Sequence, residues 1–131
     1  LFIMNLYETV YIVRQDIRAE ELKPIEDKFE NLLRLKKSSI EYKENWGLRN
    51  LAYKINNTKK GYYYFIVHNS EPDAVLELER YFKINENIIR FLTTKTSKIP
   101  SEPTPIMKAK IDKENVERST QEVDLNNKGS K

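Results

Sequence analysis

The sequence predicts an α+β protein with a ferredoxin-like βαββαβ sandwich, in which a four-stranded antiparallel sheet carries two helices on one face and an extended C-terminal tail follows. Apolar residues recur at helical spacing in two separate segments. Four apolar runs surround them, in the order strand, helix, strand, strand, helix, strand. Each predicted helix has a single apolar stripe and crossovers are right-handed, so both helices are expected on the same face of the sheet.

The first three elements are predicted between residues 6 and 55. Residues 6–13 form an apolar, β-rich run that predicts a strand. Asp16 is expected to cap the following helix, and Pro24 suits its first turn, where a missing N–H matters least. Residues 39–55 predict a long strand, in which Gly47 indicates a bulge or bend. The predicted helix buries one stripe, which consists of Leu22, Ile25, Phe29, Leu32 and Leu33.

The second half of the domain repeats this pattern. Residues 56–61 have the composition of a turn, and residues 62–68 form the next apolar strand. Ser70 is expected to cap the second helix, and residues 88–96 predict the last strand. The buried face of this helix is expected to consist of Ala74, Val75, Leu78, Tyr81 and Phe82.

Composition divides the chain into three parts. Residues 1–4 form a short N-terminal extension, and residues 5–96 form the folded domain with most of the apolar and aromatic side chains. Residues 97–131 contain three of the five prolines, no aromatic residue and mixed charge. Such a segment cannot bury enough apolar surface to offset its ordering entropy, so a flexible charged tail is expected.

The composition excludes most catalytic chemistry. There is no cysteine, a single histidine (His68) and only three isolated glycines. Thiolate nucleophiles, cysteine or histidine metal clusters and glycine-rich phosphate loops are therefore absent, and we expect no enzyme activity, metal, cofactor or small-molecule substrate. No run approaches the ~20 apolar residues that cross a bilayer, and an intracellular location is expected. A net charge of +3 permits a polyanionic partner without requiring one.

Several residues suggest contact with a partner. In residues 62–67 the side chains expected on both faces of the sheet are apolar or aromatic. Either the tyrosines are half-exposed on the face without helices, or that face is a docking surface for RNA or protein. Trp46 suits core or interface packing better than base stacking, and His68 suits a structural role. Arg90 lies within an apolar strand, so we expect it either to contact RNA or to form an ion pair with Glu8.

A resemblance covers residues 5–96. Residues 47–55, Gly-Leu-Arg-Asn-Leu-Ala-Tyr-Lys-Ile, match the Gly-x-Arg-x-Leu-Ala-Tyr-x-Ile signature of the bacterial small-subunit ribosomal protein six family. Residues 7–8, 61–63 and 87–90 resemble the starts of the family's first, third and last strands, and residues 104–110 resemble the tails of some members. Some members have two consecutive arginines where this chain has Ile89-Arg90, and many have a basic residue at the position of Leu6.

The resemblance implies a structural constituent of the small ribosomal subunit that supports translation. It implies binding to the central domain of small-subunit ribosomal RNA together with ribosomal protein eighteen, in a bacterial cytoplasm or a mitochondrial matrix. The residues expected to bind RNA are Arg90, Arg49, Lys54, Asn87, Lys95 and Tyr62. Those expected at the protein interface are Trp46, Leu48, Tyr53 and Tyr7.

Three other proteins of this architecture fit less well. An acylphosphatase needs a glycine-bearing phosphate loop after the first strand, which Arg14-Gln15-Asp16 lacks. An RNA-recognition motif needs a K/R-G-F/Y-G/A-F-V-x-F/Y run, which residues 60–65 match only in part. A small-molecule regulatory domain would bind its ligand between two copies, and the charged tail argues against it.

Overall fold

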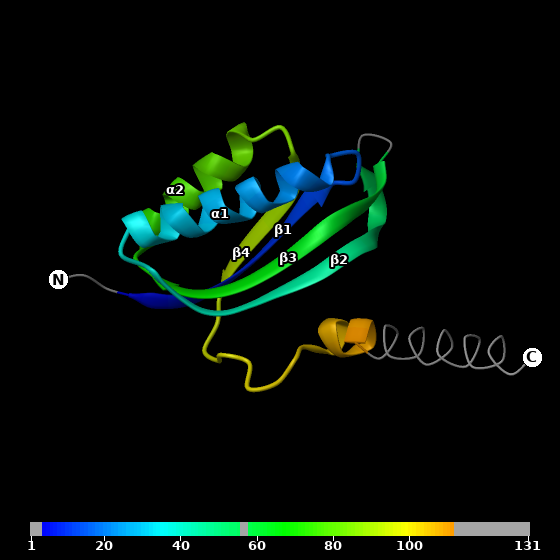
Figure 1. Ribbon diagram of the computed structural model, residues 1–131. Coiled ribbons are helices and arrows are strands. Elements are labelled where there is room, and N and C mark those ends of the chain that lie inside the picture. Colours follow the sequence, from blue (N-terminus) through cyan, green and yellow to red (C-terminus); the bar gives the residue numbers. More distant parts are fainter. Residues whose placement is uncertain (1–3, 56–57, 112–131) are drawn as a thin grey trace, which may run out of the picture. The chain divides into compact units, whose positions relative to one another are not determined.

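The computed structural model describes residues 4–55 and 58–111, apart from the side chains of residues 52–55. The sheet has the order β2-β3-β1-β4 with antiparallel neighbours, and both helices cover one face of it (Figure 1). This confirms the predicted ferredoxin-like sandwich. The elements are β1 (Asn5–Arg14), α1 (Ala19–Leu35), β2 (Ser39–Ile55), β3 (Thr58–Ser70), α2 (Pro72–Ile84) and β4 (Ile88–Lys95).

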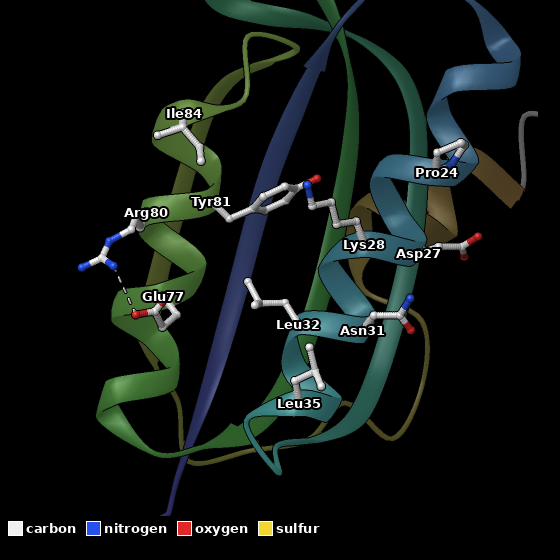
Figure 2. Close-up of a pocket in the computed structure, with 10 residues that line it drawn as sticks. All are labelled: Pro24, Asp27, Lys28, Asn31, Leu32, Leu35, Glu77, Arg80, Tyr81 and Ile84. Carbon is white, nitrogen blue, oxygen red and sulfur yellow. Dashed lines mark ion pairs between the residues drawn. The ribbon is translucent and has the colours of Figure 1, made fainter.

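Aromatic rings form the centre of the core between the helices and the sheet. Tyr11 of β1 lies 5.2 Å, between ring centroids, from both Phe29 of α1 and Phe82 of α2, and these two phenylalanines are also 5.2 Å apart. Burial raises the pKa of the Tyr11 hydroxyl far above its usual value. Further out, Leu32 of α1 and Tyr81 of α2 extend into the space between the helices, where the Tyr81 ring points toward Lys28 (Figure 2). The buried residues of both predicted stripes form one core cluster with residues of the sheet.

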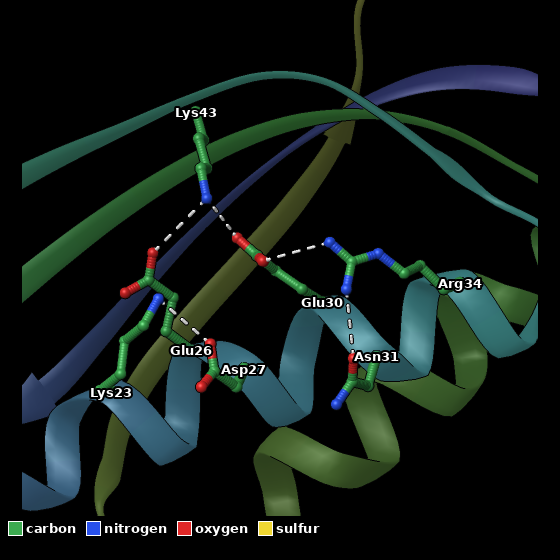
Figure 3. Close-up of polar contacts among 7 residues, drawn as sticks. All are labelled: Lys23, Glu26, Asp27, Glu30, Asn31, Arg34 and Lys43. Carbon is green, nitrogen blue, oxygen red and sulfur yellow. Dashed lines mark hydrogen bonds and ion pairs between the residues drawn. The ribbon is translucent and has the colours of Figure 1, made fainter.

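A buried carboxylate fixes α1 against β2. Glu30 is almost fully buried, and its Oε1 lies 2.8 Å from Nζ of Lys43, on the helix-facing side of β2 (Figure 3). Nζ of Lys43 also lies 3.9 Å from Glu26, and Arg34 approaches Glu30 at 3.8 Å. A carboxylate removed from water needs such a charge partner, so these contacts constrain where β2 lies beneath α1.

Three local predictions were wrong at element boundaries. The N-cap of α1 is Arg18, without a side-chain cap bond, whereas Asp16 forms an ion pair with Arg14 at 3.4 Å. The N-cap of α2 is Glu71, because Ser70 still belongs to β3. The turn predicted at residues 56–61 is shorter, because β3 begins at Thr58 and pairs there with Ile55. Strand pairing overrides the local preference of these polar residues for turns and caps.

His68 lies in a polar cluster on the helix-facing side of the sheet. Its Nδ1 is 2.7 Å from Oγ of Ser70 and its Nε2 is 2.9 Å from Oγ1 of Thr9, which is itself 3.0 Å from Oγ1 of Thr93. The ring of Tyr7 stacks on the imidazole with centroids 5.9 Å apart. The imidazole is fully buried, and this burial lowers its pKa to about 4. The structural role predicted for His68 agrees with these contacts.

The chain divides into two compact units at Pro100. In the second unit the structure describes a helix at residues 105–111. Oγ1 of Thr104 accepts a hydrogen bond from the backbone N–H of Met107 at 3.3 Å, and Lys108 forms an ion pair with Glu102 at 2.9 Å. The flexible tail at residues 97–131 stays a prediction.

His68 predicts a loss of stability in mild acid. Below pH 6.5 the unfolded chain takes up a proton at His68, whereas the folded chain does so only near pH 4. The free energy of unfolding should fall by about 3 kcal/mol between these values and be unaffected by this group above pH 6.5. Urea denaturation across this range should show a shallower decline for His68→Gln than for the parent. Parallel pH curves for the two proteins would show that His68 does not cause the loss.

Candidate nucleic-acid interface

Three arginines lie on the face of the sheet opposite the helices, here called the second face, at one end of the sheet. Arg49 of β2 pairs with Gly61 of β3, and Gly61 pairs with Arg14 of β1. Arg90 of β4 pairs with Ile12, two residues before Arg14. Directly paired residues point to the same face, and Arg14 and Ile12 share theirs by alternation. Arg14, Arg49 and Arg90, here called the arginine row, thus cross all four strands over roughly 14 Å.

A bulge in β2 brings Arg49 into this row. Asn45 pairs with Tyr64 and Gly47 with Tyr63, so Trp46 is an extra residue without a partner on β3. In a regular ladder without this bulge, Trp46 would pair with Tyr63. Every later residue of β2 would then face the other side of the sheet, and Arg49 would point toward the helices. Gly47 has a φ of 76°, in the left-handed region that favours glycine, and its N–H donates to Oδ1 of Asn45 at 2.9 Å.

Gly61 leaves the middle of the row without a side chain. A Cβ atom there would lie 2.4 Å from Cγ2 of Ile12 and 3.1 Å from the carbonyl oxygen of Val13. Any larger residue would therefore push Ile12 aside. Nothing projects from β3 between Arg49 and Arg14, so a ligand can approach the backbone between the two guanidinium groups.

The arginines of the row keep their charge available. Arg90 is exposed and forms no ion pair within the described part of the chain. The alternative prediction of an ion pair with Glu8 is wrong, because Glu8 pairs with Thr94, four residues or roughly 13 Å along β4. Glu8 instead accepts a hydrogen bond from the Thr94 hydroxyl at 3.3 Å. Arg14 pairs with Asp16, but both side chains are exposed, so this ion pair is weak.

An aromatic stack adjoins the row on the second face. The ring of Trp46 lies parallel to Phe65, with centroids 5.4 Å apart, and also stacks on Tyr63 at 6.3 Å. Nε1 of Trp46 donates to Oε1 of Glu44 at 2.8 Å, and the hydroxyl of Tyr42 donates to the other carboxylate oxygen. Burial and this bond raise the pKa of Tyr42 to about 12. Trp46 is therefore a packing residue, fixed by its ring contacts and by Glu44.

The other residues expected to bind RNA are scattered. Asn87 lies beside the arginine row, because its carbonyl oxygen accepts a hydrogen bond from the backbone N–H of Arg14 at 2.9 Å. Tyr62 is half-buried against the core on the helix-facing side. Lys95 is exposed at the opposite end of β4, where it pairs with Tyr7. Lys54 belongs to β2, but its side chain lies outside the described part of the chain.

The residues expected at the protein interface are similarly dispersed. Leu48 is exposed but pairs with Tyr62 on the helix-facing side. Tyr7 is buried against His68 on that same side. The side chain of Tyr53 is not among those described. Sequence reasoning missed Leu92, which is 63% exposed on the second face and pairs there with Val10.

Sequence reasoning also missed Arg14. The residue directly follows the first predicted strand, residues 6–13, and it resembled a loop residue next to Gln15 and Asp16. Its position depends on pairing with Gly61, 47 residues later in the chain, and no local pattern reports such a register. The one indication in the sequence was that Arg14 stands two residues after Ile12, so alternation along a strand would place both side chains on the same face.

Among the described residues, no group of three or more His, Cys, Asp or Glu side chains could hold a metal ion. None of the helices in that part of the chain is long and apolar enough to cross a membrane.

Comparisons with known proteins agree with this architecture. A family model described as ribosomal protein S6 matches residues 6–95. The small ribosomal subunit protein bS6 of Rickettsia prowazekii (strain Madrid E) is 50% identical over 105 residues, which cover 80% of this chain and 87% of that protein. The corresponding protein of Rickettsia bellii (strain RML369-C) is also 50% identical over 105 residues, covering 80% of this chain and 88% of that protein.

The crystal structure of 30S ribosomal protein S6 from Thermotoga maritima has the same fold. Its TM-score is 0.68 at 23% sequence identity, and the match covers 91% of this chain and 99% of that one. At this identity the likeness supports the fold alone.

The bulge at Gly47 can be tested by substitution. Because its φ of 76° strains a β-branched residue, Gly47→Val should lower the free energy of unfolding by about 1–3 kcal/mol. Gly47→Asn should lower it less, since asparagine tolerates the left-handed region. Urea denaturation of the three proteins measures the difference. Equal midpoints for the parent and the valine variant would contradict the role of this backbone conformation.

Proposed function

The chain belongs to the ribosomal protein S6 family, a structural and non-enzymatic component of the small ribosomal subunit, and we propose that there it binds the central domain of the ribosomal RNA together with ribosomal protein eighteen. The ribosome in question is a bacterial one in the cytoplasm, as the Rickettsia relatives suggest. The observation that carries the RNA proposal is the arginine row.

The arginine row suits a phosphate backbone. A guanidinium group presents several N–H donors in a fixed fork and keeps its charge at any physiological pH, so it binds phosphate oxygens in pairs. Arg14, Arg49 and Arg90 are held by a hydrogen-bonded sheet, and rigid strands place charged groups more accurately than loops do. Three cations across the sheet can follow successive phosphates of one RNA strand.

The modest charge explains why a protein partner is needed. With a net charge of +3, long-range attraction to RNA is weak, and three phosphate contacts supply only part of a typical specific affinity. A second protein adds contacts and fixes the RNA conformation. The second face offers it the exposed Leu92 and the half-buried Tyr63, which is held by the packed ring of Trp46, and apolar and aromatic residues of this kind anchor protein interfaces.

Loss of Arg90 should weaken RNA binding through one phosphate contact. In the presence of ribosomal protein eighteen, Arg90→Ala should make the slope of log affinity against log salt shallower by about one unit. Arg80→Ala removes the same charge from α2, on the opposite side of the sheet, and should leave the slope unchanged. Filter binding over a salt series measures both. Equal slopes for the parent and Arg90→Ala would place the RNA elsewhere.

Ribosomal protein eighteen should raise the affinity for central-domain RNA strongly. Leu92→Ser should reduce this enhancement while leaving RNA binding by the chain alone unchanged, because Leu92 carries no charge and is already exposed. Filter binding with and without the partner tests the proposal. Equal RNA affinity of the parent chain in both conditions would contradict cooperative binding, and full enhancement of Leu92→Ser would remove Leu92 from the interface.

A further inference from the structure

A groove runs between α1 and α2 on the outer side of the helices. It has a volume of about 430 Å³, and Leu32 and Tyr81 form its floor (Figure 2). Leu35 and Ile84 lie at its two ends and are 79% and 75% exposed. Tyr81 and Leu32 also pack in or against the core, whereas Leu35 and Ile84 are not part of the buried cluster.

The groove lies away from the arginine row. The row and the aromatic stack occupy the second face of the sheet, whereas the helices cover the first (Figure 1). Exposed leucine and isoleucine side chains that line one groove, rather than lying singly on the surface, are typical of an interaction site. RNA and ribosomal protein eighteen, as proposed above, leave this groove unexplained.

The size of the groove suits a helix. Its lining extends along α1 from Pro24 to Leu35, which is about 16 Å, or three turns. A partner helix laid along it would present apolar residues at i, i+3 or i+4, and i+7, the spacing by which amphipathic helices fill grooves. Leu32, Leu35 and Ile84 would then be covered by such a stripe.

Four charged side chains line the groove, and they differ in whether a neighbour of opposite charge lies close to them. Asp27 already forms an ion pair with Lys23 at 3.2 Å, and Glu77 with Arg80 at 3.4 Å. Lys28 differs, because no carboxylate lies within ion-pair distance of it among residues 4–55 and 58–111. Its Nζ lies over the ring of Tyr81, 5.4 Å from the centroid, at the middle of the groove. The charge left without a partner in this lining is therefore positive.

We propose that the groove between α1 and α2 docks an amphipathic helix of a partner protein, with the apolar stripe of that helix on Leu32, Leu35 and Ile84 and a carboxylate against Lys28. The aromatic ring of Tyr81 holds the ammonium group where a glutamate beside the stripe reaches it. The chain thus has two interaction surfaces, one on each side of the sheet.

Two synthetic helical peptides of about four turns test the proposal on the full chain. Both carry the same leucine stripe, flanked in one peptide by glutamates and in the other by lysines. Fluorescence anisotropy should show tighter binding of the acidic peptide. Lys28→Glu should weaken that peptide about threefold to tenfold and favour the basic one. Ile84→Asp should abolish binding of both, whereas the matched control Leu92→Asp on the second face should leave both unchanged.

Three results would overturn the proposal. Equal binding of the two peptides would remove the role of Lys28. Equal loss of binding in Ile84→Asp and Leu92→Asp would place the peptide elsewhere. A dimer of the free chain that Ile84→Asp dissociates would identify a second copy as the occupant of the groove. Thermal melts of each variant must match the parent, which the exposure of Lys28, Ile84 and Leu92 leads us to expect.

Discussion

The extra residue in β2 at Trp46 determines what the second face presents. Because side chains alternate along a strand, one inserted residue reverses the direction of everything after it. Here the bulge brings Arg49 opposite Gly61 and in line with Arg14. The left-handed backbone of Gly47 permits the bulge. The place of Arg49 in the arginine row, which carries the proposed RNA contacts, therefore depends on this irregularity in the ladder.

The charges of the domain have different roles on its two sides. On the helix-facing side, Glu30 is buried and is matched by Lys43, so this pair contributes to where β2 lies and has no capacity left for a ligand. On the second face, Arg49 and Arg90 project from within β2 and β4 and form no ion pair with another described residue. A net charge of +3 over the whole chain does not report this local difference.

The fold was predictable because its signals are local. Ile25, Phe29 and Leu33 recur at helical spacing, and the same residues are buried against the sheet. Gly47 indicated the bulge for the reason that the structure shows. The caps were less predictable: Asp16 and Ser70 have the right chemistry for caps, but strand pairing and an ion pair engage them first.

The candidate site was predictable only in part, because it depends on register. Arg49 and Arg90 were expected from their motif and from their place in an apolar strand, and both lie in the arginine row. Arg14 joins them through a pairing across the sheet that no short segment encodes. Tyr62 neighbours Gly61 in sequence yet points to the core, since adjacent residues of a strand face opposite sides.

The central claim is that ribosomal RNA lies along the arginine row. The chain contains no cysteine, so a single introduced cysteine can carry an iron chelate that cleaves nearby RNA by hydroxyl radicals. Gln15→Cys places the probe in the exposed turn directly after Arg14, and Leu76→Cys places it on the exposed surface of α2. In reconstituted small subunits, the account predicts strong cleavage of the central-domain RNA from position 15 and little from position 76. Strong cleavage from position 76 with none from position 15 would contradict it.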